Sequence, residues 1–314
     1  MNRVISFSLV ILLHLQILVS VGYAHPTQMV EAVSSSSVTT TIQSVEQHVF
    51  IPKPAGTAVV HKIKRVLPPH KIKRMINDTP SSLIRSDADY ADLLDHLPIQ
   101  ETLINTIPSD QLLIDHKKSI LYQALQKLPK EHRQALQVLI LKEETGKTRG
   151  LGGQNTIVLT MGNLNEEELI GVWMHEIGHV VDTGLLQGKG NRTSIFQDGH
   201  KPVLQDDPST VFYQYSWKTT AERRGGSTAL DFVTGYAMSD PFEDFAESYT
   251  YYVLHGNTFR SMLSSSMVLS QKYHFLKEKI FGGQEFDTGE NTLPTKREFD
   301  ATLVVFDIQR FLHT

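Results

Sequence analysis

Two histidines four residues apart, with a glutamate directly after the first, are the side chains of this sequence best suited to chemistry. They are His175, Glu176 and His179, within the segment 166–184, EEELIGVWMHEIGHVVDTG. On a helix, side chains four positions apart share a face, so both imidazole rings can reach one zinc ion at about 2.0–2.1 Å. Glu176 is turned by about 100° from His175 and lies beside the metal, where it can take a proton from a water molecule. The spacing therefore predicts a hydrolytic zinc site.

The alternative is an accidental match, in which two histidines and a solvated glutamate lie on a helix surface. Apolar residues recur at helical spacing around the motif, namely Leu169, Val172, Trp173, Ile177 and Val180. This stripe predicts that the helix packs against a core. A His-Glu-His group turned toward a core without a metal would leave polar groups unpaired. We therefore favour the zinc site.

Both ends of this helix carry sequence signals. Asn165 is a common N-cap residue, and Glu168 three positions later completes a capping-box pattern. Gly184 is placed to end the helix. Asp182 lies seven residues after His175 on the same face, and two roles are open to it. It can orient a ligand histidine, or it can cap the helix end.

A catalytic zinc ion needs a third protein ligand and one open position. The metzincin spacing would place a glycine and a histidine at positions occupied by Asp182 and Leu185, so that class is excluded. A second helix, predicted to start after the cap residue Asp240, carries Glu243 and Glu247 four positions apart on one face. Either glutamate can be the ligand. Taken singly, Glu243 can also be a capping residue and Glu247 an exposed helix glutamate.

Two segments resemble the catalytic core of the lethal-factor type metallopeptidases. They are HEIGHVVD at 175–182 and YAMSDPFEDFAE at 236–247. This group of gluzincins includes the protease domain of the anthrax toxin and the secreted Pro-Pro endopeptidases. The resemblance covers roughly 80–100 residues, and its motifs are specific in combination.

The resemblance implies a zincin-like metallopeptidase domain and a role for each site residue. His175, His179 and Glu243 would bind the zinc ion, Tyr236 would assist catalysis, and Glu247 would be the second glutamate of the family. It also implies that an extended peptide substrate adds, as a further strand, to an edge strand near residues 155–160.

The long stretch between the two motifs departs from the family, so the family's substrate preferences do not transfer. This stretch contains an aromatic cluster of Phe212, Tyr213, Tyr215 and Trp217. Such a cluster can line a substrate cleft, but it more often packs in a core or at its rim. We favour packing.

The remaining elements predict an α+β fold, with a mixed sheet beside the motif helix and the second, ligand-bearing helix. Helices are expected over 109–126 and 129–137, and strands over 138–144 and 155–160. Between the strands, the glycine-rich segment 150–153 is expected to turn the chain.

The N-terminus has the features of a signal peptide. A positively charged start precedes a mostly apolar run, and small residues at Gly22 and Ala24 suit cleavage after residue 24. The alternative is a membrane anchor, but polar residues interrupt the run, whereas a span needs about 20 apolar residues. We therefore expect residues 1–24 to be removed and the protein to be secreted, extracellular or associated with the cell envelope.

Residues 25–80 differ from the body of the chain. HKIKR occurs at 61–65 and again at 70–74, and residues 25–75 carry seven Lys/Arg against two Asp/Glu, a net charge of +5. Residues 76–314 carry 22 against 32, a net charge of −10. The basic segment can be a pro-segment, a tether that contacts an anionic surface through residues 61–74, or a solvated linker. Residues 81–314 would form the metallopeptidase domain.

Composition excludes several classes of function. The chain has no cysteine, which rules out disulfides, thiolate zinc sites and a cysteine nucleophile. A net charge of −4 argues against nucleic acid as the main partner. The sequence thus favours a secreted zinc endopeptidase with one Zn²⁺ per chain, Glu176 as general base and a peptide or protein substrate. The alternative is a zinc-stabilised, non-catalytic binding or structural protein of the cell surface.

Overall fold

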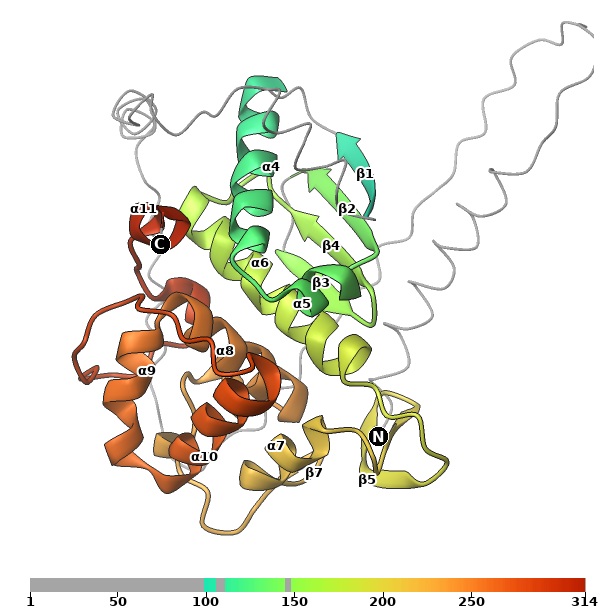
Figure 1. Cartoon of the computed structure of the whole chain (residues 1–314), viewed down its shortest axis with the longest axis vertical. Helices are drawn as coiled ribbons and strands as arrows, with labels where there is room; N and C mark the ends of the chain where they lie inside the picture. Colours follow the sequence, from blue (N-terminus) through green and yellow to red (C-terminus); the bar gives the residue numbers. More distant parts are fainter. Residues whose placement is uncertain (1–98, 106–110, 145–147, 314) are drawn as a thin grey trace, which may run out of the picture. The chain divides into compact units, whose positions relative to one another are not determined.

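The computed structural model describes residues 99–105, 111–144 and 148–313 (Figure 1). The predicted signal peptide (1–24), the segment 25–80 with its basic repeats at 61–74, and the start of the predicted 81–314 domain lie outside these residues. Within the described part of the chain, no helix combines the length and the apolar character needed to cross a membrane.

Helices and strands follow one another along the described chain. The strands are β1 (Gln100–Asn105), β2 (Val138–Glu143), β3 (Gly150–Gly153), β4 (Thr156–Thr160), β5 (Thr193–Asp198), β6 (Lys201–Leu204), β7 (Trp217–Thr219) and β8 (Glu222–Arg223). The α-helices are α4 (Gln111–Gln126), α5 (Lys130–Ala135), α6 (Glu166–Val180), α7 (Ser209–Ser216), α8 (Pro241–Leu254), α9 (Gly256–Met262), α10 (Met267–Phe275) and α11 (Ile308–His313). The 3₁₀ helices are η3 (Ala229–Asp231), η4 (Tyr236–Met238), η5 (Leu263–Ser265) and η7 (Ala301–Leu303), and the π-helical turns are η2 (Val181–Leu185) and η6 (Leu276–Ile280).

A mixed sheet lies beside the helix that carries the histidines. Its strand order is β1-β2-β4-β3, in which β1, β2 and β4 run parallel and β3 runs antiparallel to β4. On β2 and β4 every second residue is buried, which follows from the two-residue period of a strand that packs one face on a core. α6 packs against β3 and β4, and α4 lies alongside α6 (Figure 1). This mixed α/β architecture agrees with the predicted class.

The predicted position of the sheet edge was wrong. β4, which covers most of the predicted edge segment 155–160, lies between β2 and β3. The edge on this side is β3, formed by the glycine-rich segment that we expected to be a turn. A run of glycines gives no strand signal in a sequence, because strands are recognised by the pattern of their side chains. Glycine is required in β3 because this strand lies against the backbone of α6. A Cβ on Gly152 would lie 2.5 Å from the carbonyl oxygen of Glu176.

The motif helix does not end at Gly184 as predicted. α6 ends at Val180 and continues directly into the π-helical turn η2, which contains Gly184. A Cβ at this position would lie 1.8 Å from the carbonyl oxygen of Gln154. Gly184 is therefore required where the chain passes close to the turn between β3 and β4, and it does not act as a helix terminator.

The two helices that carry the candidate ligands cross at small residues. A Cβ on Gly178, between the two histidines of α6, would lie 2.9 Å from Cα of Ala246 on α8. Small residues at a crossing let two helix backbones approach closely. This contact brings the first turn of α8 to the histidine face of α6.

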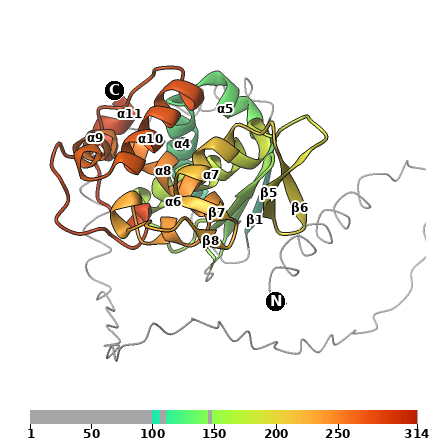
Figure 2. The same ribbon diagram turned by 90° about the horizontal axis from the view of Figure 1, so that it is seen from below.

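Buried polar and aromatic contacts hold α8 in place. Lys272 of α10 and Asp244 of α8 are fully buried, with Nζ 2.7 Å from Oδ2, and the indole N–H of Trp217 donates to the same oxygen at 2.9 Å. Phe212 packs edge-on against Phe245 of α8. The packing role predicted for the aromatic cluster is confirmed, since Phe212, Tyr213 and Trp217 are buried and Tyr215 is half-buried. Figure 2 shows α9 and α10 at one end of the view and the β5–β6 hairpin at the other.

Candidate metal centre

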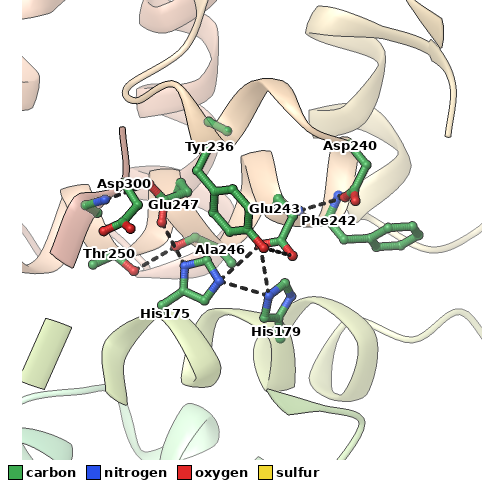
Figure 3. Close-up of polar contacts among 12 residues, drawn as sticks. His175, His179, Tyr236, Asp240, Phe242, Glu243, Ala246, Glu247, Thr250 and Asp300 are labelled. Atoms are coloured by element: carbon green, nitrogen blue, oxygen red, sulfur yellow. Dashed lines mark hydrogen bonds and ion pairs between the residues drawn. The ribbon is translucent and has the colours of Figure 1, made fainter. Parts of the chain in front are cut away.

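The predicted cap residues Asn165 and Asp240 cap the starts of α6 and α8, but the predicted capping box at Glu168 is not formed, because the Glu168 carboxylate contacts Arg149. The side chain of Asn165 accepts a hydrogen bond from the backbone N–H of Glu168 at 2.9 Å. The Glu168 carboxylate accepts one from Arg149. Asp240 Oδ1 accepts from the backbone N–H groups of Phe242 and Glu243, both at 2.9 Å. The second cap places Glu243 in the first turn of α8, facing α6 (Figure 3).

Three side-chain atoms from these two helices lie close together and form a triangle (Figure 3). Nε2 of His175 lies 3.1 Å from Nε2 of His179 and 3.1 Å from Oε2 of Glu243. Nε2 of His179 lies 3.4 Å from the same oxygen. Ligands bound tetrahedrally to zinc at about 2.0–2.1 Å are separated from one another by about 3.3–3.4 Å. The triangle formed by the three atoms therefore has the dimensions of one face of a zinc coordination shell.

The chemistry of these three side chains also fits a cation. Oε2 of Glu243 is buried, and its neighbours are the two imidazole Nε2 atoms. Burial opposes the charged form of Glu243, but the two histidines outweigh burial and hold the pKa of the carboxyl well below its usual value. Burial likewise opposes the charged form of His175, and hydrogen bonds to Glu243 and Glu247 outweigh it and raise the pKa well above the usual value. Surroundings that favour an imidazolium also favour a metal cation at the same place.

Glu247 stands behind His175 and uses both of its carboxylate oxygens. Oε1 lies 2.8 Å from Nδ1 of His175, while Oε2 accepts hydrogen bonds from the Thr234 hydroxyl at 2.6 Å and the Ala301 N–H at 2.7 Å. Glu247 is fully buried. A carboxylate on one ring nitrogen fixes the tautomer of the histidine, so that the other nitrogen faces the metal.

Glu176 lies between the histidine helix and the edge strand. Its side chain is buried, and a Cβ on Gly150 would lie 2.3 Å from its Oε1. Burial raises the pKa of Glu176, while the two histidines and the Gly152 N–H act in the opposite direction. A carboxyl with a raised pKa takes up a proton more readily, which suits a general base.

Tyr236 lies on the other side of the histidine pair. Its hydroxyl donates a hydrogen bond to Oε1 of Glu243 at 2.9 Å, and its ring stacks on His175 with centroids 5.9 Å apart. Burial and the Glu243 carboxylate raise the pKa of the hydroxyl. Tyr236 is therefore a neutral hydrogen-bond donor at neutral pH.

Asp182 takes neither of the two roles left open for it. The Tyr213 hydroxyl lies 2.7 Å from both of its carboxyl oxygens, and none of the hydrogen bonds described for Asp182 goes to His175 or His179. Burial raises the pKa of Asp182 to about 8. The π-helical turn η2 explains the difference, because its wider turn rotates later residues away from the face expected for a regular helix. The Asp182 carboxyl instead links η2 to α7 through its hydrogen bond with the Tyr213 hydroxyl.

Sequence reasoning missed several groups that surround the centre. Thr234 and the Ala301 N–H hold Glu247, and Gly150 and Gly152 make room for Glu176. One of these groups, the Ala301 N–H, belongs to the backbone, and all four residues lie outside the two motifs. The glycine run of 150–153 was the one available signal.

Comparison with known families supports a zinc metallopeptidase. Residues 157–300 match the sequence model of a family described as "Putative zinc-binding metallo-peptidase". This range contains all three atoms of the triangle together with Glu176, Tyr236 and Glu247. No curated protein matches the sequence significantly.

Proposed function

We propose that this protein is a zinc-dependent endopeptidase of the gluzincin type, with His175, His179 and Glu243 as the metal ligands. The observation that carries the proposal is the triangle of donor atoms with sides of 3.1, 3.1 and 3.4 Å. The family match to zinc-binding metallopeptidases and the sequence resemblance to the lethal-factor type support it. We further propose that the protein is exported, on the basis of the signal-peptide features of residues 1–24.

Each polar group around the centre has a distinct task in this proposal. A zinc ion held by His175, His179 and Glu243 would supply Lewis-acid chemistry and would lower the pKa of a water molecule. The Glu176 carboxylate would accept a proton from the attacking water and pass it to the leaving amine. Tyr236 turns its hydroxyl from Glu243 to the substrate oxygen on which negative charge develops. Glu247 keeps His175 in the orientation that ligation requires.

The substrate is a peptide or protein that lies along the edge strand. The resemblance implied strand addition at the sheet edge, and in the described sheet the edge next to Glu176 is β3. Strand addition uses backbone hydrogen bonds, so it fixes the direction of the peptide and leaves side-chain preference to the surrounding residues.

Metal content and peptide hydrolysis together test the proposed function. We expect protein purified without added metal to contain one zinc per chain, measured by elemental analysis, and to cleave members of a peptide library. Zinc without cleavage would favour a zinc-stabilised binding protein of the cell surface. Well under half an equivalent of any transition metal would contradict the enzyme.

We expect Tyr236→Phe to lower the turnover number strongly with little change in KM. The variant keeps the ring that stacks on His175 and removes only the hydroxyl. Loss of one oxyanion donor raises the barrier by about 2.7–4 kcal/mol. Steady-state kinetics measure the effect, with zinc content and melting temperature as controls. A turnover number within about threefold of wild type, which corresponds to less than about 1 kcal/mol, would remove Tyr236 from the reaction.

A further inference from the structure

A short segment, residues 298–302, lies against the start of η4, where Tyr236 is the first residue. The backbone N–H of Gly235 donates to the carbonyl of Glu298 at 2.9 Å, and the N–H of Tyr236 donates to the carbonyl of Phe299 at 2.5 Å. The two aromatic rings are also in contact, with centroids 5.8 Å apart. Two successive backbone hydrogen bonds and a ring contact leave Tyr236 little freedom to shift independently of this segment.

The same segment holds the carboxylate behind His175. The N–H of Ala301 donates to Oε2 of Glu247 at 2.7 Å, and Ala301 is buried. Glu247 is therefore held at Oε2 by Ala301 and Thr234, which aims Oε1 at Nδ1 of His175. If the Ala301 N–H were lost, a buried carboxylate oxygen would lose one of its two donors, and the carboxylate could rotate.

Arg149 fastens this segment to the motif helix. Its guanidinium donates to Asp300 Oδ2 at 2.9 Å and to the Thr302 hydroxyl at 2.6 Å, and it also donates to Glu168 of α6 at 3.1 Å. Arg149 directly precedes β3, the edge strand beside Glu176. Asp300 in turn caps η7 by accepting from the Thr302 N–H.

We propose that residues 298–302 form a strap that positions Tyr236 and Glu247 for the reaction, and that Arg149 holds the strap in place. The proposal rests on the proposed function. The strap residues are positioning residues. They contact Tyr236 and Glu247, and none of the described contacts joins them to the three candidate ligand atoms, which are Nε2 of His175, Nε2 of His179 and Oε2 of Glu243. In the proposed function Tyr236 contributes to turnover and Glu247 contributes to zinc affinity, so one segment would influence both properties.

Ala301→Pro tests the contact with Glu247, because it removes the N–H that donates to Glu247, and the local backbone conformation can accept a proline. Ala301 is the first residue of η7, a position that suits proline, and Asp300 before it is extended, with φ −135° and ψ 163°. We expect zinc affinity, measured by competition with a chromophoric chelator, to fall about 10–100-fold. The matched control is Ala229→Pro, at the exposed first residue of η3, which also follows an extended residue. The control should bind zinc within about twofold of wild type.

Arg149→Gln tests the fastening of the strap without changing the strap itself. We expect the turnover number to fall about 10–100-fold, with KM and melting temperature changed little. Arg260→Gln is the matched control, because Arg260 is similarly exposed, at 27% against 35%, and its guanidinium also fastens a loop, through Asp287 and the Phe286 carbonyl. If the strap acts on turnover through Tyr236, adding Arg149→Gln to Tyr236→Phe should lower the rate much less than it does in wild type.

The outcomes separate failure of the strap from failure of the proposed function. If Ala301→Pro folds and binds zinc as well as Ala229→Pro does, the contact with Glu247 has no positioning role. If Ala301→Pro does not fold, the Arg149 pair decides: equal turnover in Arg149→Gln and Arg260→Gln, or full additivity with Tyr236→Phe, overturns the strap. If wild-type protein cleaves no peptide, the proposed function fails, and zinc affinity in Ala301→Pro against Ala229→Pro still decides whether the strap positions Glu247.

Discussion

Glu176→Gln should strongly reduce peptide hydrolysis while the protein keeps its zinc and its fold. Glutamine has nearly the same shape, so it fits the space beside Gly150 and Gly152 and still accepts the Gly152 N–H. It cannot take up a proton, and loss of a general base lowers the rate by about 10²–10⁴-fold. Peptide hydrolysis, zinc content and melting temperature should be measured on the same preparation.

Glu167→Gln is the matched control for this experiment. Glu167 lies on the exposed side of the first turn of α6, so the same chemical change is made on the same helix away from the centre. It should leave all three measurements unchanged. If Glu176→Gln lost zinc and kept its residual rate, Glu176 would be a metal ligand or a structural residue, and the role of general base would be wrong.

Glu243→Ala should reduce zinc affinity far more than Glu247→Ala does. Glu243 Oε2 lies within 3.4 Å of both histidine Nε2 atoms, whereas Glu247 meets His175 only at Nδ1. Removal of Glu243 therefore removes a ligand atom. Removal of Glu247 leaves all three ligand atoms and disturbs the orientation of one, which typically costs about 10–100-fold in affinity. Chelator competition measures both values.

Thermal stability should follow the opposite order. Glu247 is fully buried, and its removal leaves the Thr234 hydroxyl and the Ala301 N–H without their acceptor. Each unpaired buried donor costs about 1–3 kcal/mol. Melting temperatures of the metal-free proteins should therefore fall more in Glu247→Ala than in Glu243→Ala. If Glu247→Ala instead bound zinc more weakly than Glu243→Ala, Glu247 would be the metal ligand and the assignment of Glu243 would be wrong.

The local elements of the site could be predicted from the sequence because their signals are local. The helix cap at Asn165, the cap at Asp240 and the four-residue spacing of the histidines all act within one or two helical turns. The structure has α6 and α8 at the expected places for this reason. The role of Gly184 was misjudged, because a glycine near a helix end and a glycine under a neighbouring carbonyl look alike in a sequence.

The sequence by itself determined which side chains could bind a metal, and only the tertiary structure decided which of them meet. Glu243 and Glu247 share one helix face. Glu243 contacts the Nε2 atoms of both histidines, whereas Glu247 contacts Nδ1 of His175. This difference depends on how α8 crosses α6 at Gly178 and Ala246. The edge strand beside Glu176 and the segment 298–302 behind Glu247 are likewise contacts between segments far apart in the chain. Spacing along a helix is set by its regular geometry, whereas these contacts depend on packing and on backbone hydrogen bonds, which any residue type can make.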